Sequence, residues 1–169
     1  MSTIEIRLLG DPVLRQRAEA VEQVDGDIRR LVEDMFETMY AAEGIGLAAP
    51  QVGVSKRLFV MDIRDPEAEP QAVVNPVIVE HSGSERGEEG CLSLPGLYGV
   101  VERSAQIVME GLDPDGKPIR IDASGLLARC IQHEIDHVDG ILYIDRLSPI
   151  KRKMLLSKWK KLQREAAGR

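Results

Sequence analysis

The stretch His133-Glu134-Ile135-Asp136-His137 holds two of the three histidines in the chain. In a helix, side chains four residues apart lie on one face, with Cβ atoms about 5–6 Å apart. Two imidazoles at that spacing can bind one metal ion, and Glu134 beside them can act as a general base. Short motifs of this kind also recur by chance in helices. Two ordinary histidines, in the core or at the surface, therefore stay an alternative until other residues agree.

Length and composition indicate one globular domain over residues 1–169. Hydrophobic residues make up 43% of the chain and charged residues 30%, which is enough apolar surface to bury a core. No apolar run approaches the ~20 residues of a membrane helix, and the N-terminus lacks a secretory signal pattern. Two cysteines allow one disulfide but make no disulfide framework. We therefore expect a reducing cytoplasm and no membrane partner.

The charge of the chain is unevenly distributed. The net charge of −6 argues against a general nucleic-acid binder, so no DNA partner is expected. Residues 149–169 nevertheless hold eight Lys or Arg against one acid, Glu165. Helical spacing predicts a helix from Ile150 to about Glu165, with an apolar stripe that packs on the domain. Its members are Ile150, Met154, Leu155, Trp159 and Leu162.

A first helix is predicted from the apolar residues between Ile28 and Tyr40, which recur at helical spacing. Asp25 or Asp27 can cap its start. Gly44 lies where the C-terminus of a helix favours a residue in the left-handed conformation.

The remaining pattern predicts strands and one further helix. The turn Asp113-Pro114-Asp115-Gly116 indicates a hairpin, and Pro76 indicates an edge or an interruption in its strand. Ser124 can cap a helix that carries the histidine pair and ends near Gly140. The fold class is therefore α+β, with mixed or antiparallel strands around a buried helix that presents the metal site. The predicted strands cover residues 57–63, 71–79, about 100–112 and 118–122.

Two histidines leave a divalent ion short of ligands, because catalytic sites usually take three protein ligands. Cys130 precedes His133 by one helical turn, but its apolar neighbours favour a buried core thiol. His81 lies among polar residues, which favours an exposed side chain, and nearby carboxylates are further candidates. Cys91 follows a glycine-rich polar segment from which a thiolate can reach a metal. Spacing alone leaves Cys91 open between a ligand and an idle thiol.

The stretch Gly44-Ile45-Gly46-Leu47-Ala48-Ala49-Pro50-Gln51-Val52-Gly53 is rich in glycine and alanine. Such a segment permits an extended backbone that another chain can approach closely. It is either a plain loop before the next strand or the wall of a peptide groove, with Gln51 donating through its amide. Composition leaves both interpretations open.

Three separated motifs, in order and at matching spacing, make the sequence resemble peptide deformylases over nearly its whole length. They are Gly44-Ile45-Gly46-Leu47-Ala48-Ala49-Pro50-Gln51, Glu89-Gly90-Cys91-Leu92-Ser93 and Gln132-His133-Glu134-Ile135-Asp136-His137, preceded by Gly10-Asp11-Pro12-Val13-Leu14-Arg15. The resemblance implies a hydrolase that removes the formyl group from the N-terminal formylmethionine of new polypeptides and releases formate. It also implies a bacterial cytoplasmic setting, which the absence of an N-terminal extension supports.

The resemblance further implies the roles of single residues. Cys91, His133 and His137 would bind the metal, expected to be Fe²⁺, with Zn²⁺, Ni²⁺ or Co²⁺ as substitutes. Glu134 would be the acid/base residue when metal-held hydroxide attacks the formyl carbon. Gln51 and the backbone N–H of Leu92 would stabilise the oxyanion. Ile45 and Gly46 would bind the backbone of the substrate.

Such a substrate gives the basic C-terminal helix a second interpretation, docking on ribosomal RNA. Two other functions also compete with the main one. One is a metallopeptidase that uses the same helix motif, although such enzymes usually complete the site with Glu or His rather than Cys91. The other is a ribosome- or metal-binding protein without catalysis, against which the presence of Glu134 and Gln51 argues.

Overall fold

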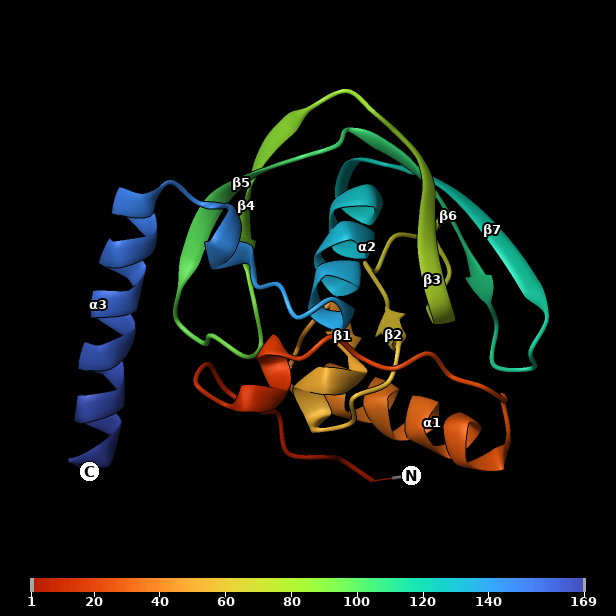
Figure 1. The fold of residues 1–169 in the computed structure, drawn as a ribbon, viewed down its shortest axis with the longest axis horizontal. Helices are drawn as coiled ribbons and strands as arrows, with labels where there is room; N and C mark the ends of the chain where they lie inside the picture. Colours follow the sequence, from red (N-terminus) through yellow and green to blue (C-terminus); the bar gives the residue numbers. More distant parts are fainter. Residues whose placement is uncertain (1, 169) are drawn as a thin grey trace.

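A computed structural model describes residues 2–168. Figure 1 shows helix α2 in the centre of the molecule, with strands on both sides, α1 below it and α3 at one edge. No helix among residues 2–168 is long and apolar enough to cross a membrane. The elements are η1 (Pro12–Arg15), α1 (Gly26–Ala41), β1 (Gly46–Ala48), η2 (Ala49–Val52), β2 (Leu58–Met61), β3 (Gln71–Ser82), β4 (Glu85–Gly90), β5 (Tyr98–Arg103), β6 (Gln106–Leu112), β7 (Pro118–Ser124), α2 (Gly125–Val138), η3 (Tyr143–Arg146) and α3 (Pro149–Ala167).

The strands form two antiparallel sheets. One has five strands in the order β1-β2-β3-β6-β7, and the other pairs β4 with β5. The chain passes over α2 from β3 to β4 and returns from β5 to β6, so α2 lies between the two sheets (Figure 1). This arrangement confirms the predicted α+β class with antiparallel strands around a central helix.

The core fixes where α2 lies. Successive side chains of a strand point to opposite faces, and β2 is buried on both. Phe59 and Met61 pack against α2, whereas Leu58 and Val60 pack on the α1 side. Burying one such side chain contributes about 1.5–3 kcal/mol. The sheet is therefore covered on both faces, and α2 is fixed by its own apolar residues, among them Ile131.

Helix α1 starts as predicted but ends differently. Asp25 caps it by accepting the N–H of Ile28 at 3.0 Å. The left-handed residue at its end is Glu43, with φ 58°, and not Gly44. The N–H of Gly44 instead donates to the carbonyl of Met39 at 2.9 Å, which closes a Schellman motif one residue earlier than expected.

Helix α2 also begins and ends at the predicted residues. Ser124 is its N-cap, although the side chain makes no capping hydrogen bond. Gly140 adopts φ 77° just after the C-terminus. The predicted hairpin forms between β6 and β7, with Gly116 in its turn at φ 81°. Pro76 lies at a register shift of β3, which is the interruption that the proline indicated.

The predicted strand at about 100–112 is wrong as a single element. It consists of β5 and β6, which belong to different sheets. Strand β4 was not predicted, because its sequence Glu-Arg-Gly-Glu-Glu-Gly has no apolar alternation. The buried side chain of β4 is Glu89, which is only 6% exposed. A strand whose inward face is charged gives no hydrophobic signal.

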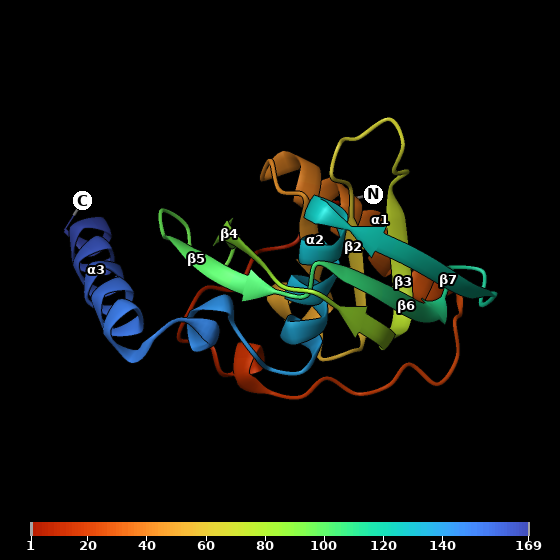
Figure 2. The ribbon, with the colours of Figure 1, turned by 90° about the horizontal axis from the view of Figure 1, so that it is seen from above.

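Helix α3 forms where predicted, and Leu155, Trp159 and Leu162 of its predicted stripe pack on the domain, but Ile150 and Met154 do not. Ile150 and Met154 are 74% and 67% exposed, so their expected packing on the domain is wrong. Trp159 is buried in a cluster that Leu155, Leu156 and Leu162 border. Viewed from above, α3 stands beside β5 rather than over the core (Figure 2). Its contact face is narrow, which leaves the first turns of the helix exposed.

Two glycines with similar φ angles give a matched test of this packing. A Cβ on Gly140 would lie 2.7 Å from the carbonyl oxygen of Arg15, whereas at Gly116 the nearest atom, Val24 Cβ, would be 3.8 Å away. Both substitutions by alanine carry left-handed strain of about 1–2 kcal/mol, and only Gly140→Ala adds a backbone clash. We expect Gly140→Ala to lower the free energy of unfolding by about 2 kcal/mol more than Gly116→Ala. Urea unfolding of the metal-free proteins measures this, and equal losses would contradict the packing.

Candidate metal centre

Three side chains with metal-binding atoms meet between α2 and the end of β4. His133 and His137 lie one turn apart on α2, and Cys91 directly follows β4. The Nε2 atoms of the histidines are 3.2 Å apart, and Cys91 Sγ lies 3.3 Å from His137 Nε2. All three ligand atoms lie within 4.8 Å of one another. The structure thus brings together the ligands that the sequence predicted.

This arrangement fits a divalent transition metal. A tetrahedral ion with bonds of about 2.0–2.3 Å has ligand atoms roughly 3.3–3.8 Å apart, close to the two shorter separations here. Two imidazoles and one thiolate suit iron, zinc, cobalt and nickel. Three protein ligands leave one position of such an ion for water or substrate. His133 and His137 are 8% and 1% exposed, so the site is largely shielded from solvent.

A buried carboxylate orients the first histidine. Glu89 Oε1 lies 2.8 Å from His133 Nδ1, so that Nε2 of the ring faces the ligand cluster. Burial alone would raise the pKa of Glu89. Hydrogen bonds from Arg103 and His133 outweigh burial and hold the pKa of this carboxyl far below its usual range. Glu89 is thus charged and bonds a candidate ligand, while Cys91, not a carboxylate, is the third member of the candidate cluster.

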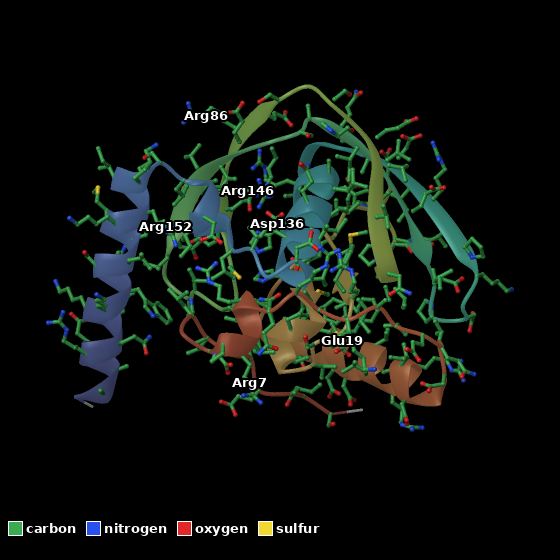
Figure 3. The ribbon with its side chains drawn as sticks, in the orientation of Figure 1. Arg7, Glu19, Arg86, Asp136, Arg146 and Arg152 are labelled. Carbon is green, nitrogen blue, oxygen red and sulfur yellow. The ribbon has the colours of Figure 1, made fainter. Side chains whose placement is uncertain are left out.

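Arg103 connects this carboxylate to the motif helix, and a second arginine, Arg146, binds the same helix. Arg103 donates to Glu89 at 2.8 and 2.9 Å and to Asp136 at 2.6 Å. Asp136 also accepts two hydrogen bonds from Arg146, and Figure 3 shows these two side chains side by side between α2 and η3. The motif pattern predicts no role for Asp136. Its partners come from β5 and η3, which sequence spacing does not connect with the motif.

Gln51 points its amide nitrogen at the ligand cluster. Its Oε1 accepts the N–H of Ala48 at 2.9 Å, which fixes the orientation of the amide. Its Nε2 then donates to Ser93 Oγ at 3.0 Å and lies 3.5 Å from Cys91 Sγ. An amide held at both ends is a preorganised donor. The role of Ser93 was not visible in the sequence, although it belongs to the same motif as Cys91.

Ile45, Gly46 and Leu92 all line the cavity beside the candidate ligands. Close approaches of the backbone to side chains make this possible. A Cβ on Gly44 would lie 2.6 Å from Leu92 Cδ1, and one on Gly46 would lie 2.5 Å from Glu134 Oε2. These two glycines are therefore needed for room rather than for unusual φ angles. The N–H of Leu92 donates no hydrogen bond to any acceptor among residues 2–168. That N–H remains able to donate to a bound molecule.

Glu134 is the one buried carboxylate beside the ligands that lacks an arginine partner in the described part of the chain. It is 3% exposed, and its Oε1 has no hydrogen-bond partner within residues 2–168. Burial raises the pKa of Glu134 to about 7. A carboxyl with that pKa can accept and release a proton near neutral pH.

A cavity of about 520 Å³ opens beside these groups. Gly44, Ile45, Gly46 and Gln51 line one side of it, so the segment that composition left ambiguous forms a groove wall. That segment is not a plain loop, because it folds as β1 and η2. Two other candidate ligands take the places predicted for them. Cys130 is a buried free thiol in the core, and His81 is exposed on β3.

A cysteine and two histidines that can hold one metal ion beside a cavity, with a buried carboxylate next to them, are typical of the class of metal-dependent hydrolases. The family model of polypeptide deformylases matches residues 3–153. A peptide deformylase from Alkalilimnicola ehrlichii is 51% identical over 98% of this chain and 93% of its own length. The crystal structure of a peptide deformylase from Legionella pneumophila superposes with a TM-score of 0.93 at 48% identity, over 99% of each chain.

A peptide deformylase from Ehrlichia chaffeensis, crystallised with actinonin, has a TM-score of 0.92 and 44% identity over 97% of this chain and 99% of its own. The chain belongs to the polypeptide deformylase family. This family consists of metal-dependent hydrolases that remove the N-formyl group from nascent polypeptides. The resemblance inferred from the three motifs is therefore confirmed.

The role of Glu89 is testable through metal affinity. Glu89→Gln keeps the shape but removes the charge that stabilises the His133 N–H and pairs with Arg103. We expect metal affinity to fall about 10–100-fold, as for other groups that hold a metal ligand in place. Chelator competition measures this. Glu88→Gln, at the adjacent exposed position, is the control, and equal affinity in the two variants would contradict the role.

Proposed function

We propose that Cys91, His133 and His137 hold the metal while this chain removes the formyl group from N-formylmethionine of new polypeptides. The observation that carries this proposal is the position of Glu134. It lies beside the three ligands at the wall of a cavity that also receives the Gln51 amide. A hydrolytic site requires an ion, a base and an oxyanion donor around one open space.

Glu134 performs the proton transfers of the reaction. A divalent ion held by Cys91, His133 and His137 would lower the pKa of a bound water toward neutrality. Glu134 takes a proton from this water while the water oxygen bonds to the formyl carbon. The same carboxyl then gives the proton to the methionine nitrogen as the C–N bond breaks. The products are formate and a polypeptide with a free amino terminus.

Gln51 and Leu92 stabilise the negative oxygen that develops on the formyl group. The Gln51 amide is fixed by Ala48 and Ser93, so it needs no reorientation when charge appears. The Leu92 N–H is the second donor. One preorganised donor of this kind typically contributes about 10²–10³ in rate.

The peptide lies along β1, which is the edge strand of its sheet. An edge strand has unpaired backbone groups that can bond an added strand. Ile45 and Gly46 present this backbone at the cavity wall, directly beside Glu134. Backbone pairing gives affinity for many sequences, which suits an enzyme that acts on many new polypeptides.

We assign Fe²⁺ as the metal in the cell, with Zn²⁺, Ni²⁺ or Co²⁺ as substitutes. The support is the mixed thiolate and imidazole donor set, which these ions share. A bacterial cytoplasm is the proposed setting. Its support is that Cys91 and Cys130 are both free thiols, as a reducing compartment maintains them.

A formate-release assay on formyl-Met-Ala-Ser under anaerobic conditions tests the proposed reaction. We expect turnover by the wild type and a loss of at least 10³-fold in Glu134→Gln with metal still bound, because the proton acceptor is gone. Cys91→Ala, which removes a ligand, should instead lose the metal itself. Metal content is measured on the same samples. Release of amino acids without formate would indicate a peptidase, and no turnover with any divalent metal would indicate a binding protein.

We also propose that α3 docks on ribosomal RNA. Its support is an exposed basic face beside the exposed Ile150 and Met154, which the domain does not use for packing. Ribosome docking would bring the enzyme to its substrate as synthesis proceeds. Binding of this kind relies on phosphate contacts and weakens as salt increases.

Charge removal on α3 tests this docking without disturbing the buried Trp159. Replacing the exposed Lys151, Lys153 and Lys158 by glutamine should reduce co-sedimentation with ribosomes at least fivefold at low salt. The control replaces three exposed arginines outside α3 by glutamine and should leave co-sedimentation unchanged. These are Arg17, Arg86 and Arg120. Equal loss in both triple variants would leave only a nonspecific charge effect and refute the docking.

A further inference from the structure

The metal-side cavity continues along α2 toward Arg129. Its lining includes Glu134 and His133 on one helical turn, and Arg129 and Cys130 on the preceding turn. One turn spans about 5.4 Å, which is comparable with the reach of a methionine side chain. A formylmethionine whose formyl carbon lies beside Glu134 can therefore extend its side chain to the level of Arg129.

Arg129 lines this cavity together with the apolar side chains of Ile45, Leu126 and Cys130 and with the acidic Glu88 and Glu89. Its Nη1 donates to Glu89 Oε2 at 2.8 Å and to the carbonyl of Val101 at 2.9 Å. Its Nη2 donates to the carbonyl of Glu85 at 2.8 Å.

These contacts occupy three of the five N–H groups of the guanidinium. Within residues 2–168 no acceptor bonds the remaining two, and the side chain is 12% exposed. Arg129 therefore retains donor capacity while it lines the cavity.

The absence of a side chain at Gly87 on β4 leaves room for the guanidinium of Arg129. A Cβ on Gly87 would lie 3.0 Å from both Nε and Cζ of Arg129. The guanidinium thus lies directly against the backbone of Gly87, where any larger residue would move it. Gly87 and Arg129 together place a cationic donor where the tip of the substrate side chain is expected.

We propose that Arg129 is a specificity-determining residue that lets the enzyme deformylate N-formylmethionine sulfoxide as well as N-formylmethionine. This inference rests on the proposed function. The sulfoxide oxygen is a strong hydrogen-bond acceptor, and burying it without a donor would be unfavourable. Arg129 supplies that donor. The bonds that change are those of the ordinary reaction, because water cleaves the formyl C–N bond and the S–O bond is untouched.

Arg129 also connects β4 and β5 to α2, so a purely structural role is the competing interpretation. The two interpretations differ in what they do to substrate choice. A loss of positioning slows both substrates alike. A loss of the donor slows the sulfoxide more than the thioether.

The test compares kcat/KM for formyl-Met-Ala-Ser and its methionine sulfoxide analogue by formate release. In Arg129→Leu we expect the sulfoxide-to-methionine ratio to fall about tenfold from its wild-type value, as expected when a charged hydrogen-bond donor is lost. Gly87→Ala retains Arg129 but displaces its guanidinium, and it should lower the ratio in the same direction. Arg120→Leu, an exposed arginine on β7, should leave the ratio unchanged.

An unchanged ratio in Arg129→Leu overturns the inference. If that variant does not fold, the ratio in Gly87→Ala decides by the same criterion. Failure of the proposed function and failure of the role of Arg129 give different results. Absence of turnover on formyl-Met-Ala-Ser by the wild type refutes the proposed function, whereas turnover with an unchanged ratio refutes only the role of Arg129.

Discussion

The buried carboxylate of Glu89 is the interaction on which the metal centre depends. It bonds His133 on one side and Arg103 and Arg129 on the other. It is the main polar connection between the small β4-β5 sheet and α2. Arg103 extends the network to Asp136 on the same helix. Removing one partner from a buried ion pair typically costs about 3–5 kcal/mol, because the other charge is left uncompensated. The orientation of a metal ligand and the attachment of a sheet thus share one carboxylate.

The second constraint is the close approach of backbone to the site. Gly44 leaves room for the Leu92 side chain, and Gly46 leaves room for the Glu134 carboxylate. Gln51 is held by two hydrogen bonds that fix its amide direction. Three chain segments that are distant in sequence therefore surround one open space. Their donors and the buried acid are in place before a substrate arrives, which is the preorganisation that hydrolysis requires.

Prediction from sequence succeeded where one physical signal dominated. The apolar period of α1 and the cap and glycine signals of α2 placed both helices, and the Asp-Gly turn placed the β6-β7 hairpin. Prediction failed where the folded chain buries charged side chains or leaves apolar side chains exposed. Strand β4 buries a charged face, so it has no apolar alternation. Helix α3 has apolar residues at helical spacing, yet Ile150 and Met154 remain exposed because only a narrow edge of the domain faces the helix.

The candidate metal motif, the separate cysteine, the order of the three motifs and the α+β class could all be predicted from the sequence alone. Helical spacing places His133 and His137 on one face whatever the rest of the chain does. Spacing left Cys91 open between a ligand and an idle thiol, and only the motif resemblance implied its role. The folded chain brings Cys91, and not Cys130 one turn away from His133, to the two histidines. Only the packing of distant segments shows which buried carboxylate beside the histidines lacks an arginine partner among residues 2–168. Arginines from other elements hold Glu89 and Asp136 in charged pairs, while Glu134 is buried without an arginine partner in the described residues 2–168. That difference depends on contacts between distant segments, which no local pattern contains.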